Sequence, residues 1–273
     1  MDSRITKPVQ NVLDHYLNLF QEKLPETLDG LYIHGSIALD AYQEGSSDID
    51  FMAVVNKPLG EEEVQAISRI HQELKRQQTI EMDGSYILNN EVGRNSNKIS
   101  ECLYVNGGKA MRSKHEMNPV TWWMMKNKGI RWTGPDITSF SIEVEESELT
   151  SFLLRNMNSY WAGRVNMLKK YKRVAAFLPN RLIEQELLWS VPGVLRQYYT
   201  LQERAVISKA EVCTFAFDHI PEKWHLILNE VISLRDDGKT GYYKSKKKKI
   251  DDLLQFLIYI ITYCNEKFND QKN

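Results

Sequence analysis

Apolar residues in the first half of the chain alternate between helical spacing and short runs of strand length. The second helical segment opens with three glutamates, and a helix N-terminus favours acidic residues. The predicted order is a helix at 9–24, strands at 30–35 and 48–55, a helix at 60–78 and a strand at 79–88. Helices alternating with strands predict an α/β fold for this half.

Beyond about Asp136 the pattern becomes entirely helical. Helices are predicted at about 147–177, 181–203, 222–234 and 247–268. The sequence "VPGV" at 191–194 predicts a kink or a break, since proline lacks an amide donor. "SKAE" at 208–211 has the form of a capping box. We therefore divide the chain into an α/β domain, 1–145, and a helical domain, 146–273.

Composition narrows the class of protein. The 273 residues are 42% apolar and 26% charged, which is typical of an ordered globular chain. The net charge of −1 argues against a nucleic-acid binder. The three cysteines lack metal-ligand spacing, which favours reduced thiols and a cytoplasmic location. The apolar run that starts at Leu253 is too short to cross a membrane, and the lysine-rich run 244–249 predicts a solvated loop.

The stretch from Leu31 to Val55 carries the candidate chemistry. Asp48 and Asp50 stand two residues apart, so on a strand both would project from one face and repel each other unless a cation lay between them. Oxygen ligands of this kind suit Mg²⁺, which completes its shell with phosphate oxygens. Gly35, Ser36 and Ser46 could hold those phosphates, a combination that favours phosphoryl or nucleotidyl transfer. The alternative is that the acids cap a strand end and that Gly-Ser is a turn.

The stretch "HGSIALDAYQEGSSDIDFMAVV" resembles the G-S…D-x-D signature of the nucleotidyltransferase superfamily related to DNA polymerase beta. Further segments resemble the aminoglycoside (3'')(9) adenylyltransferases, which modify streptomycin and spectinomycin. They are "DGSYIL", "ECLY", "GIRWTGPDI", "LRQYYT", "ISKAE" and "IPEKWHLIL". The resemblance implies a nucleotidyltransferase fold with a small mixed sheet, followed by an all-α bundle that binds substrate and ATP. It also implies ATP as co-substrate, Mg²⁺ as cofactor and a drug hydroxyl as acceptor. We expect small-molecule partners, no nucleic acid or membrane, and a monomer.

Individual residues can be carried over from this resemblance. Asp48 and Asp50 match the metal-binding aspartates, and Ser36 and Ser46 match phosphate-contacting serines. The family's catalytic base is a glutamate on the next strand, where this chain has Asp83. Asp83 is therefore the predicted base, although Glu81 would share its strand face and is the substitute candidate.

In the second half, Lys209 matches a phosphate-binding lysine, and an exposed helix-start lysine is the alternative. Arg196 matches an arginine near the site but could equally hold two helices together. Glu186 falls near an acid that binds the cationic drug, or is an ordinary surface glutamate. The family's drug-contacting tryptophan is replaced by "VNGGK" around Gly107, and we expect acceptor contacts near Tyr104.

These residues leave more than one function open. The leading hypothesis is transfer of AMP to spectinomycin or streptomycin, which would confer resistance. A second is nucleotidyl transfer to another antibiotic, a metabolite or a protein hydroxyl. A third is a module that binds ATP without turnover.

Overall fold

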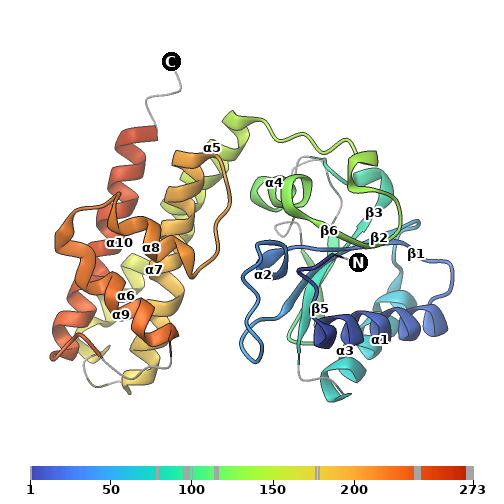
Figure 1. Ribbon diagram of the computed structural model, residues 1–273, viewed down its shortest axis with the longest axis horizontal. Coiled ribbons are helices and arrows are strands. Elements are labelled where there is room, and N and C mark those ends of the chain that lie inside the picture. Colours follow the sequence, from blue (N-terminus) through green and yellow to red (C-terminus); the bar gives the residue numbers. More distant parts are fainter. Residues whose placement is uncertain are drawn as a thin grey trace. The chain divides into compact units, whose positions relative to one another are not determined.

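The computed structural model describes residues 2–77, 80–94, 99, 101–113, 117–175, 177, 179–236 and 241–268. The chain divides into two compact units, Met1–Glu145 and Glu146–Asn273 (Figure 1). The first combines a sheet with helices, and the second is built from helices. The predicted α/β class is confirmed.

The first unit contains a six-stranded sheet in the order β5-β4-β3-β2-β1-β6. Its strands are β1 (Leu28–Ile33), β2 (Ile49–Val55), β3 (Met82–Leu88), β4 (Cys102–Asn106), β5 (Lys109–Ser113) and β6 (Ile130–Thr133). β2 and β3 run parallel, whereas the other neighbouring pairs run antiparallel. The sheet is therefore mixed, as the resemblance implied.

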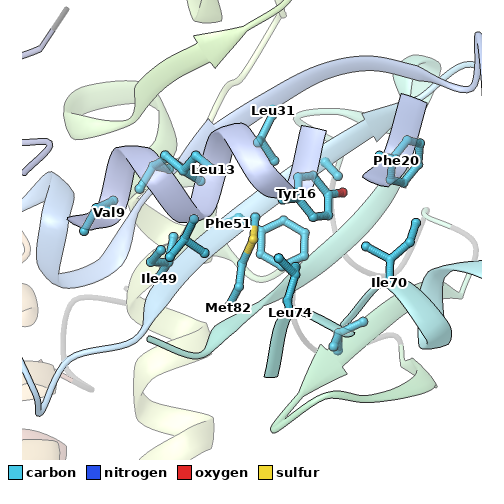
Figure 2. Packing of buried hydrophobic residues seen from close by; sticks show 14 of the residues in the cluster. Val9, Leu13, Tyr16, Phe20, Leu31, Ile49, Phe51, Ile70, Leu74 and Met82 are labelled. Atoms are coloured by element: carbon cyan, nitrogen blue, oxygen red, sulfur yellow. The ribbon is translucent and has the colours of Figure 1, made fainter. Parts of the chain in front are cut away.

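Helices cover both faces of this sheet (Figure 1). α1 (Lys7–Lys23) and α3 (Glu61–Gln77) pack on one face, and α4 (Pro119–Lys128) packs on the other. The short α2 (Gly35–Ala38) follows β1, and 3₁₀ turns occupy Asn89–Glu91 and Ile137–Ser139. The apolar residues of α1 lie at helical spacing, which places them on one buried stripe against the sheet (Figure 2).

Three polar groups are enclosed in the core beneath α1 and α3. The hydroxyls of Tyr16 and Tyr86 are 2.9 Å apart, and Nε2 of His71 lies 2.8 Å from the Tyr86 hydroxyl. Burial lowers the pKa of His71 to about 4, because the protonated ring would lose its hydration. The ring is therefore neutral at physiological pH, and the three groups satisfy one another.

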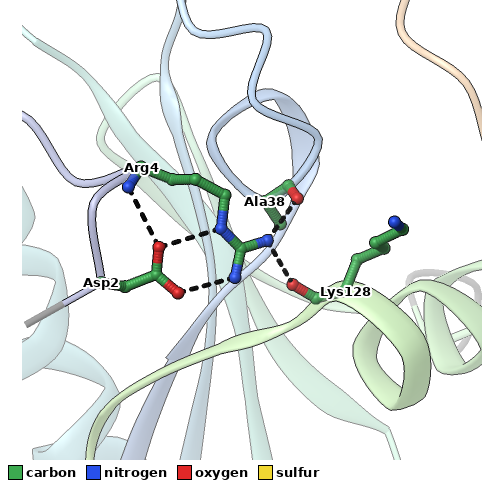
Figure 3. Close-up of polar contacts among 4 residues, drawn as sticks. All are labelled: Asp2, Arg4, Ala38 and Lys128. Carbon is green, nitrogen blue, oxygen red and sulfur yellow. Dashed lines mark hydrogen bonds and ion pairs between the residues drawn. The ribbon is translucent and has the colours of Figure 1, made fainter.

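Arg4 links the start of the chain to the last residue of α2 and to the end of α4 (Figure 3). Its Nη1 donates to the carbonyl oxygens of Ala38 (2.6 Å) and Lys128 (3.1 Å). Asp2 neutralises the guanidinium at 2.7 Å, and the hydrogen bond from Arg4 lowers the pKa of Asp2 to about 2. One cation thus joins three segments that are far apart in sequence.

The second unit is all-α, as expected. Its helices are α5 (Glu146–Asn156), a π-helical turn (Met157–Trp161), α6 (Ala162–Ala175), α7 (Asn180–Glu203), α8 (Glu211–Phe217), a 3₁₀ turn (Glu222–Trp224), α9 (His225–Arg235) and α10 (Lys246–Phe268). Among the described residues, no helix is both long enough and apolar enough to span a bilayer. All three cysteines are buried free thiols.

Of the kink or break predicted at Pro192, the break is wrong. α7 is helical from Asn180 to Glu203 with Pro192 inside it. The residues around the proline are buried, and Gly193 lies against the ring of Trp161, where a Cβ atom would come within 2.3 Å. Tertiary packing therefore outweighs the lost hydrogen bond.

Two further local predictions have opposite outcomes. The capping-box hydrogen bonds are confirmed, because the Glu211 amide donates to Ser208 Oγ (3.1 Å) and the Ser208 amide donates to Oε2 of Glu211 (3.4 Å). The prediction that the lysine-rich run 244–249 forms a loop is wrong at its C-terminal end, since α10 begins at Lys246. Lys249 is buried there, with Nζ 2.5 Å from Oε1 of the fully buried Glu230. A buried lysine needs such a partner.

Candidate active site

The connection from β1 to β2 packs directly against one of the predicted metal ligands. Gly35 has a φ of +62°, and a Cβ atom there would lie 1.7 Å from Oδ2 of Asp50. The preceding residue, His34, donates its amide to the Asp50 carbonyl at 3.0 Å. Glycine is therefore required for both the backbone conformation and the close approach. The Gly-Ser and Asp-x-Asp parts of the sequence pattern are therefore in direct contact in the structure.

Ser36 presents a hydroxyl suited to an incoming anion. Its Oγ is buried and has no hydrogen-bond partner among the described residues. A buried hydroxyl normally has a partner, so one left without one is a candidate contact for a ligand. The amide of Gly35 donates to Sδ of Met124 at 3.1 Å. A thioether is only a weak acceptor.

Ser46 and Asp48 lie in the exposed approach to β2. Ser46 Oγ lies 3.4 Å from two acceptors of Gln43, its carbonyl oxygen and its side-chain oxygen. Because β2 begins at Ile49, Asp48 precedes the strand, and the prediction that both aspartates lie on it is wrong by one residue. Asp50 is within the strand and half-buried, while Asp48 is exposed.

Asp83 stands directly beside Asp50. The two residues are partners in the parallel β2–β3 ladder, so their side chains leave the same face of the sheet. Asp83 is only 8% exposed, and its Oδ1 accepts the Gly107 amide at 2.9 Å. Burial raises the pKa of Asp83 to about 6, although the hydrogen bond from Gly107 acts to lower it. The negative charges of Asp48, Glu81 and Asp50 raise this pKa further. Both predicted metal ligands are thus close enough to influence this carboxylate.

Glu81, the other candidate base, has a different environment. β3 begins at Met82, so Glu81 lies before the strand and is exposed. Its Oε1 is 2.6 Å from Nζ of Lys75. An exposed, ion-paired glutamate is less suited to accept a proton than a buried carboxylate with a raised pKa.

Tyr104 lies on β4, opposite Ser85 of β3. Its side chain is half-buried, and its hydroxyl accepts Nδ2 of Asn106 at 3.2 Å. Three residues after Tyr104, the chain turns at Gly107, whose amide donates to Asp83. The sequence identified this turn only as the place of a missing tryptophan. Its "NGG" sequence, typical of a tight hairpin, was the signal that could have revealed it.

Lys209, Arg196 and Glu186 belong to the second unit. Lys209 is exposed, with Nζ 5.3 Å from the ring centroid of Trp189. Arg196 donates Nε to the carbonyl of Ile207 at 2.9 Å and so holds the segment that precedes Lys209.

Glu186 is not an isolated surface acid. Its carboxylate accepts two guanidinium bonds from Arg164 and one bond from the Ser190 hydroxyl. One helical turn later on α7, Trp189 donates Nε1 to the Tyr160 hydroxyl at 2.9 Å. The ion pair with Arg164 could not be predicted from local sequence, since 22 residues separate the two residues.

The oxygen atoms of Asp48, Asp50 and Ser36 are of the kind that bind hard cations, but they do not by themselves complete a coordination shell. Within the described ranges, no group of three or more acidic, histidine or cysteine side chains is arranged to hold a metal ion. Asp48 and Asp50 could supply two ligand residues, and the unpartnered Ser36 hydroxyl lies on the segment packed against Asp50. This arrangement fits Mg²⁺, which takes few protein ligands and fills its shell with water and phosphate oxygens.

Comparisons with known proteins agree with this geometry. The family model for the nucleotidyltransferase domain matches residues 13–105, which include β1, β2 and β3 with Asp48, Asp50, Glu81 and Asp83. The chain thus contains a nucleotidyltransferase domain, and the class of activity supported is transfer of a nucleotidyl group.

One solved structure is similar over nearly the whole chain. It is spectinomycin adenyltransferase AAD(9) from Enterococcus faecialis, in a crystal structure with ATP and spectinomycin. The TM-score is 0.67 at 12% sequence identity, covering 94% of this chain and 99% of that one. At this identity the likeness establishes the fold. A search of curated protein sequences finds no match to this chain.

Proposed function

We propose that this chain transfers AMP from ATP to a hydroxyl group of an aminoglycoside or aminocyclitol antibiotic, with spectinomycin and streptomycin as the first acceptors to test. Such a reaction would confer resistance. The observation that carries the proposal is the buried carboxylate of Asp83 beside Asp50, next to the Gly35–Ser36 turn. Similarity to a spectinomycin adenyltransferase along the whole chain supports the choice of acceptor.

Each residue has a chemical role in this proposal. Asp83 accepts the proton of the acceptor hydroxyl, whose oxygen then attacks the α-phosphorus. A new oxygen–phosphorus bond forms as the bond to pyrophosphate breaks, so AMP remains on the acceptor. Asp48 and Asp50 would hold Mg²⁺, which supplies charge neutralisation at the phosphates when bound. Ser36 and Ser46 would contact phosphate oxygens.

The second unit would contribute to ATP and acceptor binding. Lys209 is the proposed phosphate contact, and Arg196 keeps its segment in place through Ile207. Tyr104 of the first unit remains a proposed acceptor contact. A cytoplasmic, monomeric protein stays a prediction from the sequence.

One observation favours a different acceptor. Glu186, the acid expected to bind a cationic drug, is already ion-paired with Arg164 and accepts a hydrogen bond from Ser190. A polycationic acceptor would have to compete with that guanidinium, whereas a neutral hydroxyl compound would not. The alternative function is therefore AMP transfer to another antibiotic, a metabolite or a protein hydroxyl.

Mass spectrometry tests the assignment. The protein is incubated with ATP and Mg²⁺, once with each drug and once with a cell extract, and AMP adducts are sought. An adduct on spectinomycin or streptomycin supports the first proposal, and one found only in extract supports the alternative. Binding of Mg-ATP by calorimetry with no adduct in any arm would leave a non-catalytic ATP-binding module.

Replacement of Asp83 tests the base. Asp83→Asn should reduce turnover by about 100-fold or more while leaving Mg-ATP binding largely intact, because a positioned base contributes about that factor. Glu81→Gln is the matched control, and its activity should stay within a few-fold of the wild type. The reverse result would move the role of base to Glu81.

A further inference from the structure

The hairpin that joins β4 to β5 turns tightly on two glycines. Asn106 pairs with Lys109, so only Gly107 and Gly108 form the loop. Their φ values are +56° and +78°, the left-handed region that a two-residue hairpin requires at both positions. Because Gly108 has no side chain, Lys75 can approach the turn closely: a Cβ atom at Gly108 would lie 3.2 Å from Cδ of Lys75.

Gly107 is held on both sides of its backbone. Its amide donates to Oδ1 of Asp83 at 2.9 Å, and its carbonyl accepts from Nζ of Lys75 at 3.1 Å. Lys75 lies near the end of α3, and its ammonium group is also 2.6 Å from the Glu81 carboxylate. One cation therefore links the helix, the turn and the segment before β3.

The position of these groups argues against a role in stability alone. The side chains of Lys75 and Glu81 are 49% and 48% exposed, and exposed pairs of this kind contribute little to stability. The Gly107 amide, in contrast, bonds to a carboxylate that is almost completely buried. Because it engages Oδ1, it restrains the rotation of that carboxylate.

We propose that Lys75 is a positioning residue, which holds the Gly107 turn so that its amide orients Asp83 for proton transfer. The inference rests on the proposed role of Asp83 as base. In this role Lys75 acts through Asp83 and not by contact with ATP or acceptor. Its loss should lower kcat without changing the KM for ATP.

Kinetics of three variants test this role. Lys75→Met removes the donor but keeps the aliphatic stem, and kcat should fall about 10-fold or more, because small displacements of reacting groups are costly. Lys75→Arg can still donate to the Gly107 carbonyl and should recover most of the rate. Lys57→Met is the matched control, since Lys57 is 53% exposed in a 2.9 Å pair with Glu63 and does not contact the turn. Wild-type kcat in Lys75→Met would overturn the inference, and so would an equal fall in Lys57→Met.

A second measurement needs no turnover, so the inference can fail separately from the proposed function. Asn106–Gly107 is the only Asn-Gly pair in the sequence, and labelling Asn carbonyl carbon with ¹³C and Gly nitrogen with ¹⁵N therefore isolates the Gly107 amide in an NMR spectrum. Lys75→Met should shift this resonance and speed its hydrogen exchange about 10-fold, while Lys75→Arg and Lys57→Met should not. An unchanged Gly107 amide in Lys75→Met would overturn the positioning role even if no acceptor is found.

Discussion

Substituting Gly35 tests whether the close contact between the Gly-Ser turn and Asp50 is essential to the site. In Gly35→Ala, the new Cβ would lie 1.7 Å from Oδ2 and 2.5 Å from Cγ of Asp50, where ordinary contacts begin at 3.4 Å. Something must therefore move by more than about 1 Å, and the carboxylate is the mobile partner. Displacement on that scale costs about 100-fold in rate, equivalent to about 2.7 kcal/mol of transition-state stabilisation.

The same substitution has a second, separable cost. A left-handed backbone at φ +62° disfavours alanine by about 1–2 kcal/mol, which should appear as a loss of folding stability. Gly45→Ala is the matched control, because Gly45 has a φ of +79° but open space around its Cβ position. It should share the loss of stability and keep most of the activity.

Two assays separate these effects. Urea denaturation measures stability, and AMP transfer at saturating ATP measures kcat. We expect both variants to lose about 1–2 kcal/mol of stability, and only Gly35→Ala to lose about 100-fold in rate. Equal activity in the two variants would refute the reasoning, because backbone strain rather than contact with Asp50 would then explain the need for glycine.

Two further predictions concern stability. Because the pKa of His71 is about 4 in the folded protein and about 6.5 when unfolded, the unfolded state takes up the proton first as pH falls, and stability is lost between those values. Wild type should lose about 2 kcal/mol more than His71→Phe between about pH 7 and pH 5 in urea denaturation, and parallel curves would contradict this. Lys249→Met should cost about 3–5 kcal/mol, because it leaves the buried Glu230 carboxylate without its cation. The control Lys248→Met, which breaks an exposed pair with Asp252, should cost less than about 1 kcal/mol, and equal losses would count against the argument.

Local sequence was sufficient wherever a short segment carried its own signal. The helical spacing of apolar residues predicted α1 and α3 within two residues at either end, because such an amphipathic stripe has only one way to be buried. The capping box at Ser208 was equally local. Gly35, Ser36 and Asp50 could be identified together because their spacing follows from one strand–turn–strand connection.

Segments without a strong period were missed. The apolar pattern did not predict β4, β5, β6 or α4. β6 forms by pairing with β1, far away in the chain, and α4 has tryptophans and methionines on several sides and so lacks an amphipathic stripe. Pro192 is the converse case, since local chemistry predicted a break and packing around Gly193 overrode it.

The sequence by itself determined the class of chemistry, because the residues that define it lie within one short connection and its neighbouring strand. Only the tertiary structure gave Asp83 and Glu81 their different surroundings, since burial and the Gly107 amide act on one carboxylate and Lys75 pairs with the other. It likewise paired Glu186 with Arg164 and buried Lys249 against Glu230. The charge state and orientation of an acidic side chain depend on neighbours brought from elsewhere in the chain, and spacing along the sequence does not specify those neighbours.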